Sequence, residues 1–230
     1  MKQLSIVIPV FNKFNFTKAC LKDLSQLPDD HEIIIIDNGS SDETQRFLED
    51  NERIIYKRNN INLGFAKACN IGYSLATATN ILFLNNDIRV QSNFTDWTNS
   101  LIERCSHAIV GPTMGQLDNN LNFIQESNKV LDGNSYMSGW CLAASREIWS
   151  KLDIPREETR IGMSVAQIFS EEFGMAYFED TDLSFRAKKL GIKMEVISVP
   201  VVHFGKQTSK QFNIHKLYSE AREIFIKKWK

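Results

Sequence analysis

The first half of the chain alternates continuous apolar runs with segments whose apolar residues recur at helical spacing. Continuous apolar runs, as opposed to alternating ones, are typical of parallel strands that are covered on both faces of a sheet. In the intervening segments the apolar residues would share one face of a helix. We therefore expect strands at 4–10, within 32–44, at 53–59 and at 81–87, and helices within 11–27, from about 40 to 51 and within 62–77.

Polar residues that can cap a helix occur where the first two helices are expected to begin. Asn15 or Thr17 is the expected N-cap of the first helix, and Ser40 or Ser41 that of the second, because such side chains accept the unpaired N–H groups of a first turn. Pro9 is expected to end the first strand, since proline cannot donate to a strand ladder.

The second half of the chain is less regular, and its sequence contains no repeat, low-complexity tract or domain linker. Polar residues with Asn and Gly turn signals over 115–135 indicate a long loop or a hairpin. The other expected elements are a strand at 108–112, a strand and then a helix within 136–152, a helix that begins near Thr181, a strand at 194–204 that ends at His203, and an amphipathic helix at 214–230.

The alternation of strand and helix predicts an α/β protein with a mostly parallel central sheet flanked by helices. Ligands of such sheets bind beyond the carboxyl ends of the strands. Polar residues follow three of the predicted strands: Asn12 follows the first, Asp37 and Asn38 the second, and Asn85 to Asp87 the fourth. We expect these side chains to face one crevice.

The composition is that of a soluble globular protein: 230 residues, 43% of them hydrophobic and 24% charged. A chain of this length buries enough apolar surface to be stable without disulfides or metals. The formal net charge of −1 gives no global attraction to nucleic acid, so we expect no nucleic-acid partner.

The cysteines and the apolar runs point to a cytoplasmic protein. No Cys-x-x-Cys pair and no Cys/His cluster with zinc spacing occurs among Cys20, Cys69, Cys105 and Cys141, so we expect buried free thiols, which suit a reducing cytosol. The first ten residues lack the features of a signal peptide. No apolar run approaches the roughly 20 residues that a membrane span requires.

Two acidic stretches after strands each allow a functional and a structural interpretation. The stretch from Asp37 to Asp42 can hold a nucleobase or ribose, or it can merely cap a helix. Asp87 can bind a divalent cation together with diphosphate oxygens, because Mg²⁺ and Mn²⁺ favour carboxylate and phosphate ligands. Alternatively, Asn85, Asn86 and Asp87 form a solvated turn, which these residue types favour.

Two further candidates lie late in the chain. Glu179, Asp180 and Asp182 follow two aromatic residues, so one of them can be a general base whose pKa an apolar wall raises. The alternative is that these acids only complement the dipole of a helix start. His203, at the end of an apolar run, is either a metal ligand or an ordinary hydrogen-bonded histidine.

Six segments together resemble the inverting GT-A glycosyltransferases of family 2, most nearly the rhamnosyltransferase-like branch. They occur in the family's order: LSIVIPVFN, EIIIIDNGSSDET, NLGFAKACNIG, LFLNNDIRV, GWCLAASREIW and YFEDTDLSFRAKKLG. The resemblance spans residues 3–205. It implies one GT-A (Rossmann-like) domain over 1–230, with a nucleotide-sugar half at about 1–110, an acceptor and catalytic half at about 111–205, and a C-terminal amphipathic helix at 206–230.

The resemblance also implies roles for individual residues. Asp180 would be the catalytic base with Glu179 beside it, and Gly139 and Trp140 would lie near the sugar or acceptor. Asp87 and His203 would hold Mn²⁺ or Mg²⁺. The nucleotide-sugar would be bound by Pro9, Phe11, Asn12, Asp37, Asn38, Asn62, Gly64, Lys67, Asn85, Asn86 and Asp87.

The chain departs from the family pattern at two acids. Asn85 replaces the first acid of the "DxD" motif, and Asn38 replaces the second acid of the base-binding pair. Fewer carboxylates imply weaker cation affinity before the nucleotide arrives.

The resemblance implies sugar transfer, with inversion, from a UDP- or dTDP-sugar to a hydroxyl of a glycan, lipid-linked or protein acceptor, in glycan or polysaccharide assembly. A binding protein that kept the fold but lost catalysis is the main alternative. A nucleotidyltransferase ranks lower, because the loop PVFNKFNF after the first strand contains no glycine to cradle a triphosphate.

The basic, amphipathic C-terminal segment also has two interpretations. Its apolar face can pack on the domain, which we favour. The alternative is peripheral contact with an anionic membrane, at its inner face, where lipid-linked acceptors would be found.

Overall fold

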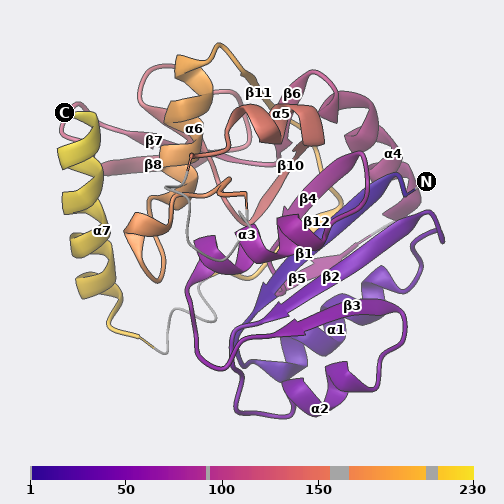
Figure 1. Cartoon of the computed structure of the whole chain (residues 1–230). Helices are drawn as coiled ribbons and strands as arrows, with labels where there is room; N and C mark the ends of the chain where they lie inside the picture. Colours follow the sequence, from indigo (N-terminus) through magenta and orange to yellow (C-terminus); the bar gives the residue numbers. More distant parts are fainter. Residues whose placement is uncertain (1, 92–93, 156–165, 206–211) are drawn as a thin grey trace.

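A seven-stranded sheet with the order β11-β6-β10-β4-β1-β2-β3 runs through the centre of the protein (Figure 1). The structure is a computed structural model that describes residues 2–91, 94–155, 166–205 and 212–230. In the order given, the strands are Lys193–Val196, Ala108–Gly111, Cys141–Ser145, Asn80–Leu84, Leu4–Val10, His31–Asp37 and Ile54–Arg58. Strands β4, β1, β2 and β3 are mutually parallel, β11 is parallel to β6, and β10 runs antiparallel to both its neighbours. The sheet is therefore mostly parallel, as expected.

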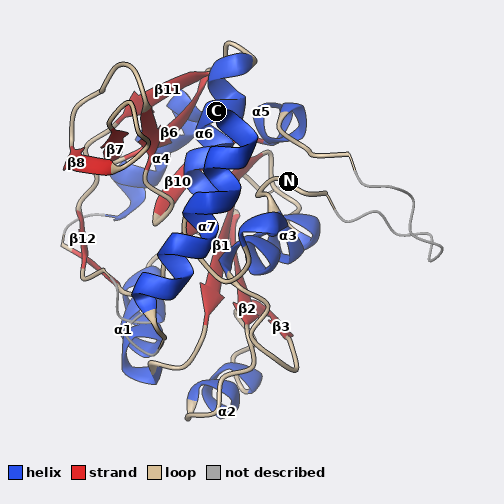
Figure 2. Ribbon diagram, turned by 90° about the vertical axis from the view of Figure 1, so that its left-hand side faces the viewer, coloured by secondary structure: helices blue, strands red, loops and turns tan. Residues whose placement is uncertain are grey.

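Helices cover both faces of this sheet, which is why its strands are continuously apolar. Ile6 and Ile8 of β1 belong to the core under one set of helices, whereas Val7 belongs to the core on the opposite face. Figure 2 shows α1 and α3 on opposite sides of the sheet. One face carries α1 (Phe14–Leu24), α2 (Thr44–Glu49) and α4 (Phe94–Cys105), and the other α3 (Phe65–Leu75), α5 (Arg146–Lys151) and α6 (Glu179–Lys189).

Two small antiparallel sheets complete the fold. One pairs β5 (Ile88–Val90) with β12 (Val201–His203), and the other joins β8 (Phe123–Ser127), β7 (Met114–Leu117) and β9 (Ser135–Met137). The 115–135 stretch is thus a hairpin, one of its two expected forms. The single strand expected at 194–204 was wrong: the chain forms β11 and β12 in different sheets, with Pro200 directly before β12. Strand β1 also continues through Pro9 to Val10.

The expected N-caps of α1 and α2 were also wrong. Helix α1 begins at Phe14, so Asn15 and Thr17 lie inside it, and the Phe14 N–H is accepted by the Asp42 carboxylate at 2.9 Å. Helix α2 begins at Thr44, whose N–H bonds the same carboxylate at 3.1 Å. Asp42 therefore serves both helix starts.

The first and second loops are also joined through serines. The Ser40 hydroxyl, offered as a cap for α2, instead accepts the Asn12 N–H at 2.7 Å. Ser41 donates its own N–H to Asn12 Oδ1 at 2.8 Å. These bonds hold the chain after β1 against the chain after β2.

The C-terminal helix α7 (Ile214–Trp229) packs its apolar face on the domain, which confirms the favoured interpretation. Ala221 and Phe225 are fully buried. The Phe225 ring contacts Phe173, the last residue of the short helix η1 (Glu171–Phe173), and Phe178, the residue directly before α6. The Asn213 side chain caps the helix by accepting the Lys216 N–H at 3.2 Å. Membrane contact stays a prediction.

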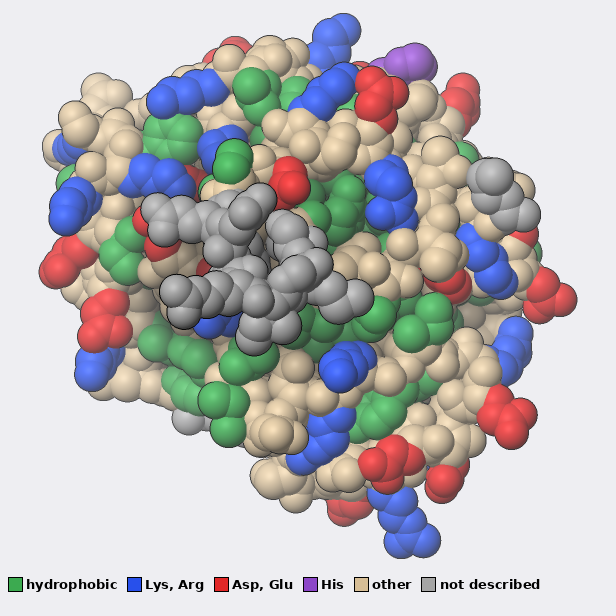
Figure 3. All heavy atoms as spheres, viewed as in Figure 1, with side chains coloured by type: hydrophobic (Ala, Val, Ile, Leu, Met, Phe, Trp, Pro, Cys, Tyr) green, Lys and Arg blue, Asp and Glu red, His purple; other side chains and the backbone are tan. Residues whose placement is uncertain are grey.

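Other expectations concern burial and charge. All four cysteines are buried and free, as predicted. Within the described ranges no helix is long and apolar enough to cross a membrane. On the face seen in Figure 3, acidic and basic side chains are interspersed, in keeping with the near-zero net charge.

Candidate active site

The pairing of β5 with β12 brings Asp87 and His203 together. His203 lies opposite Ile88 in this ladder, and the Phe204 N–H donates to the Asp87 carbonyl at 2.9 Å. The Asp87 Oδ1 and His203 Nε2 atoms are consequently 3.1 Å apart, although the two residues are 116 positions apart in the chain. The Asp87 side chain is buried and the His203 side chain is about one-fifth exposed.

Trp140 contacts this pair by stacking on His203. Its indole lies parallel to the His203 imidazole, with ring centroids 4.5 Å apart and an interplanar angle of 13°. The Trp140 carbonyl accepts the Asn85 N–H at 2.8 Å, so the turn before β10 is bonded to the end of β4. This stacking fixes the plane of the histidine ring.

Gly139 connects Trp140 to Asp180. The Gly139 N–H donates to Asp180 Oδ2 at 2.8 Å, and Thr181 N–H donates to Asp180 Oδ1 at 2.7 Å. A Cβ at position 139 would lie 3.1 Å from the same carboxylate oxygen, so glycine allows this close approach. Asp87, His203, Trp140, Gly139 and Asp180 therefore form one continuous series of contacts.

Burial controls the electrostatics of the acid pair at the start of α6. It raises the pKa of Asp180 and, with the neighbouring Asp180 charge, raises the pKa of Glu179 to about 8. Glu179 Oε2 has no hydrogen-bond donor among the residues that the structure describes. Helix α6 begins at Glu179, two residues before the expected start, so both acids stand in its first turn.

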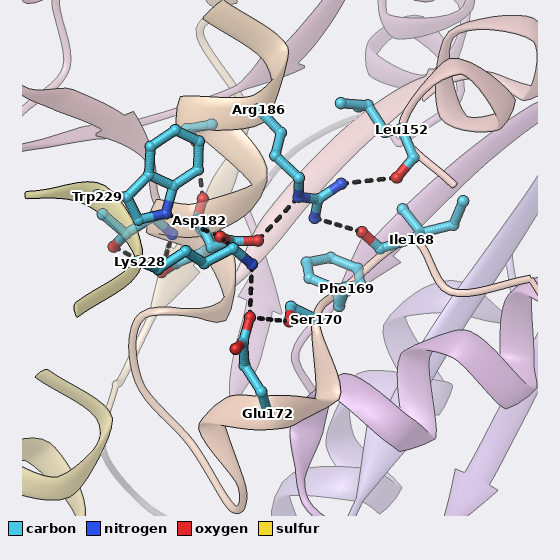
Figure 4. Close-up of polar contacts among 12 residues, drawn as sticks. Leu152, Ile168, Phe169, Ser170, Glu172, Asp182, Arg186, Lys228 and Trp229 are labelled. Carbon is cyan, nitrogen blue, oxygen red and sulfur yellow. Dashed lines mark hydrogen bonds and ion pairs between the residues drawn. The ribbon is translucent and has the colours of Figure 1, made fainter. Parts of the chain in front are cut away.

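The third acid of this stretch, Asp182, is a structural anchor for α6 (Figure 4). It is fully buried, and it accepts from Arg186 Nε at 2.8 Å and from Trp229 Nε1 at 2.9 Å. Lys228 Nζ lies 2.9 Å from it and also bonds Glu172 of η1. The last turn of α7 thus holds the turn that carries Asp180.

Two residues before α6 have unusual backbone conformations. Tyr177 and Phe178 have φ angles of 77° and 66°, in the left-handed region that bulky side chains disfavour. Such a conformation costs on the order of 1–3 kcal/mol per residue. Both rings pack against Tyr218 of α7, which stabilises the turn.

Asp37 lies at the carboxyl end of β2, but its carboxylate points into the protein. It is fully buried, Ser40 N–H donates to its Oδ1 at 2.8 Å, and the Tyr56 hydroxyl donates to its Oδ2 at 3.0 Å. Arg58, its register partner on β3, forms an ion pair with the same Oδ2. In the structure Asp37 stabilises the loop after β2 through Ser40 and Arg58. Its contact with a nucleotide stays a prediction.

Asn38 joins the second loop to the glycine turn before α3. Its Nδ2 donates to the Gly64 carbonyl at 3.1 Å, and its Oδ1 accepts from Asn59 at 2.8 Å. Asn62 Oδ1 in turn accepts the Gly64 N–H at 2.9 Å. Gly64 has φ +87°, and a Cβ there would lie 2.5 Å from the Gly174 carbonyl oxygen. Asn38, Asn62 and Gly64 therefore lie in one cluster.

The remaining predicted donor-site residues are placed differently from one another. Phe11 is partly exposed and stacks on Phe212 at a centroid distance of 5.9 Å. Lys67 is exposed in the first turn of α3. Asn86 is buried and donates to Thr17 of α1 at 2.9 Å, so its amide nitrogen is bound within the protein.

Sequence reasoning missed five residues that support the site: Tyr56, Arg58, Thr113, Glu126 and Ser138. Alternation along the third strand is the signal that could have found the first two, because residues two apart share a face. The other three depend on strand pairing in the small sheet, which no local pattern reveals.

A model of the family described as "Glycosyl transferase family 2" matches residues 5–148. The chain belongs to this family. An uncharacterised protein of Mycobacterium tuberculosis is 26% identical over 97% of this chain and 83% of its own length. Glycosyltransferase GlyG of Streptococcus pneumoniae is 24% identical, over 96% of this chain and 66% of its own length.

Two solved glycosyltransferase structures have a fold similar to that of this family member. TarS of S. aureus in complex with UDP superposes with a TM-score of 0.62 at 18% identity, over 85% of this chain and 58% of that one. Mannosyltransferase PcManGT from Pyrobaculum calidifontis, in complex with GDP-Man and Mn²⁺, gives 0.58 at 15% identity, over 85% and 54%. The chain therefore has the fold of GT-A glycosyltransferases, and it spans little more than half the length of these two structures.

Asp87 and His203 are suited to a divalent cation in this family member. A carboxylate and an imidazole are ligand types that Mn²⁺ accepts, and carboxylate oxygen also suits Mg²⁺. The two side chains already lie 3.1 Å apart. Within the described part of the chain, no third His, Cys, Asp or Glu joins them. The two residues fit a cation whose other ligands come from a substrate.

Proposed function

We propose that this family member transfers a sugar from a nucleoside-diphosphate donor to an acceptor hydroxyl with inversion of the anomeric configuration. The continuous contacts from Asp87 to Asp180 carry the proposal, because they join a cation-binding pair to a candidate base. The neighbours support the donor class: TarS is solved with UDP and with UDP-GlcNAc, and PcManGT with GDP-Man. A UDP- or dTDP-sugar remains our preferred donor.

In this proposal Asp180 is the general base. Its Oδ2, oriented by the Gly139 N–H, accepts the proton of the acceptor hydroxyl as that oxygen attacks the anomeric carbon. The bond from the anomeric carbon to the diphosphate breaks on the opposite face, and the nucleoside diphosphate leaves. One displacement inverts the configuration, so no covalent sugar–enzyme intermediate forms.

Asp87 and His203 would hold the divalent cation. When bound, such a cation neutralises charge on the departing diphosphate. The Trp140 stack keeps the His203 ring in the orientation that presents Nε2 beside Asp87. Burial and the neighbouring Asp180 charge raise the pKa of Glu179 to about 8, which favours its protonated form near neutral pH.

The donor would lie over the strand ends that carry the Asn38–Gly64 cluster. We propose that Asn12, Asn38, Asn62 and Gly64 shape the nucleotide pocket, with Pro9, Phe11, Lys67 and Asn85 beside it. The same proposal divides the chain into a donor half at about 1–110 and an acceptor half at about 111–205. It also places the protein in the rhamnosyltransferase-like branch and gives it a role in polysaccharide assembly.

A panel of UDP-, dTDP- and GDP-sugars with Mn²⁺ tests the proposal. We expect one donor to raise the melting temperature and to release its nucleoside diphosphate, slowly without acceptor and faster with it. A donor that binds without any release would support the non-catalytic alternative. Release of pyrophosphate from a nucleoside triphosphate and a sugar phosphate would support a nucleotidyltransferase instead.

A further inference from the structure

Glu126, on the exposed strand β8, accepts hydrogen bonds from two hydroxyl groups beside the candidate active site. Thr113 Oγ1 donates to Glu126 Oε1 at 2.7 Å, and Ser138 Oγ donates to the same oxygen at 2.8 Å. One carboxylate oxygen therefore joins the residue that precedes β7 to the residue that follows β9.

Strand register explains how these three side chains meet. Glu126 lies opposite Gly115, and Gly115 lies opposite Tyr136 on the other side of β7. Because residues two apart share a face of a strand, Thr113 and Ser138 are on the face that carries Glu126. The Ser138 N–H also donates to the Thr113 carbonyl at 3.0 Å, which ties the ends of the two strands together.

The Thr113 hydroxyl bonds both Glu126 and Trp140, so it links the carboxylate to the indole. A hydroxyl has one hydrogen, and Thr113 commits it to Glu126, so its oxygen presents lone pairs to other donors. The Trp140 Nε1–H donates to that oxygen at 3.1 Å. The carboxylate thereby fixes the hydroxyl orientation that holds the indole parallel to His203.

The Ser138 hydroxyl, which also bonds Glu126, holds the backbone just before the residue that contacts the candidate base. Ser138 directly precedes Gly139, whose N–H orients Asp180 Oδ2. Glu126 is thus linked to the metal-binding pair through Trp140 and to Asp180 through Gly139.

We infer that Glu126 is a positioning residue that holds Trp140 against His203, and so sets the geometry of the Asp87–His203 pair. This inference rests on the proposed function, since it assigns that pair to cation binding. Nothing in the residue types of β8 marks Glu126 for this role; only the pairing of β7, β8 and β9 does.

The test compares four variants of the full chain labelled with 5-fluorotryptophan. Glu126→Ala removes the acceptor, Glu126→Gln keeps an oxygen that can accept both hydroxyls, and Thr113→Val breaks the next link at nearly constant volume. Ile124→Ala is the control, because this side chain is 55% exposed on the same strand. A fifth variant, Trp140→Phe, serves only to assign the fluorine resonance of Trp140.

We expect Glu126→Ala and Thr113→Val to shift the Trp140 resonance while those of Trp97, Trp149 and Trp229 stay in place. Both should weaken Mn²⁺ binding in the presence of UDP by about 10-fold, the usual effect of losing a partner behind a metal ligand. Glu126→Gln and Ile124→Ala should keep both the resonance and the affinity.

An unmoved Trp140 resonance in Glu126→Ala and Thr113→Val, or Mn²⁺ affinities within twofold of the unmodified protein, would overturn the inference. If Glu126→Ala does not fold, Thr113→Val decides the question. Failure of the proposed function looks different: the unmodified protein would then bind neither UDP nor Mn²⁺, and the fluorine resonances alone would test the role of Glu126.

Discussion

The Gly139 N–H and the Asp180 carboxylate lie 2.8 Å apart, and a Cβ on Gly139 would lie only 3.1 Å from that carboxylate. The candidate base is therefore oriented by a backbone donor, and a side chain at residue 139 would require the Asp180 carboxylate to shift by a few tenths of an ångström. The same glycine is followed by Trp140, which stacks on His203. One turn of backbone thus orients both ends of the proposed site.

Gly139→Ala should lower the transfer rate by about 10- to 100-fold, since misplacing a reacting group by a fraction of an ångström to an ångström has effects of this size. The added methyl would displace the Asp180 carboxylate, whereas the donor contacts lie elsewhere. We expect the dissociation constant for UDP to stay within twofold of the original. A variant with unchanged transfer rate would show that the Gly139–Asp180 contact does not matter for catalysis.

Removal of divalent cations with a chelator should abolish donor hydrolysis, and Mn²⁺ should restore it. His203→Ala should weaken Mn²⁺ binding in the presence of UDP by at least about 10- to 100-fold, because it removes one of two protein ligands and the loss of a residue behind a ligand already has effects of this size. Isothermal titration calorimetry measures the affinity directly. His107→Ala is a matched control, since His107 is exposed and distant in sequence from both ligands. Equal Mn²⁺ affinity in both variants would exclude His203 as a ligand.

Glu179→Gln should stabilise the protein increasingly as pH rises from about 5 to 8. The folded state raises the pKa of Glu179 from its ordinary value of 4.5 to about 8, so between these values the folded chain holds a proton that the unfolded chain has lost. Stability is therefore lost across this window as pH rises. Glutamine carries no titrating proton and escapes this loss. Melting temperatures measured in parallel at pH 5, 6.5 and 8 test this, and a constant difference between the two proteins would contradict it.

Asp182→Ala should destabilise the fold by about 3–5 kcal/mol, because it leaves the Arg186 and Lys228 cations without their shared buried partner. Asp182 is fully buried and contacts both cations and the Trp229 indole. Chemical denaturation gives the free energy of unfolding. Lys227→Met, at an exposed neighbouring position, should change it by less than about 0.5 kcal/mol. Similar values for the two variants would remove the anchoring role of Asp182.

Much of the central sheet could be predicted because its strands are buried on both faces. Most of β1 and β4 consists of the continuous apolar runs Ile6–Val10 and Ile81–Leu84, which can be recognised without knowing which strands lie beside them. Helix α4 was not predicted, although Trp97, Leu101 and Cys105 recur at four-residue spacing and are all buried. Strand β5 could not be predicted, because three residues are too few for a pattern and its pairing depends on β12, far along the chain.

The candidate site shows the same division. Polar residues after the strands were expected to lie near one another, since parallel strands end at a common edge, and the structure does bond the loop after β1 to the loop after β2. The cap of α1 was misassigned because the Phe14 N–H bonds Asp42, which lies in the loop before α2 and far from α1 in sequence. The cap of α2 was misassigned because Asp42, and not Ser40 or Ser41 of the same loop, accepts the Thr44 N–H. The links from Glu126 to Trp140 depend on the register of a small sheet, and register is invisible to local pattern.

The rate of sugar transfer by Asp180→Asn, measured beside Asp50→Asn, tests the central claim most directly. Asp50 is an exposed acid at the end of α2, so its variant controls for the loss of one carboxylate. We predict that Asp180→Asn binds UDP and Mn²⁺ with unchanged affinity but transfers sugar at least about 100-fold more slowly, as expected for loss of a general base. Asp50→Asn should behave like the unmodified protein. Transfer by Asp180→Asn at the unmodified rate, in a protein that still binds UDP, would contradict the account.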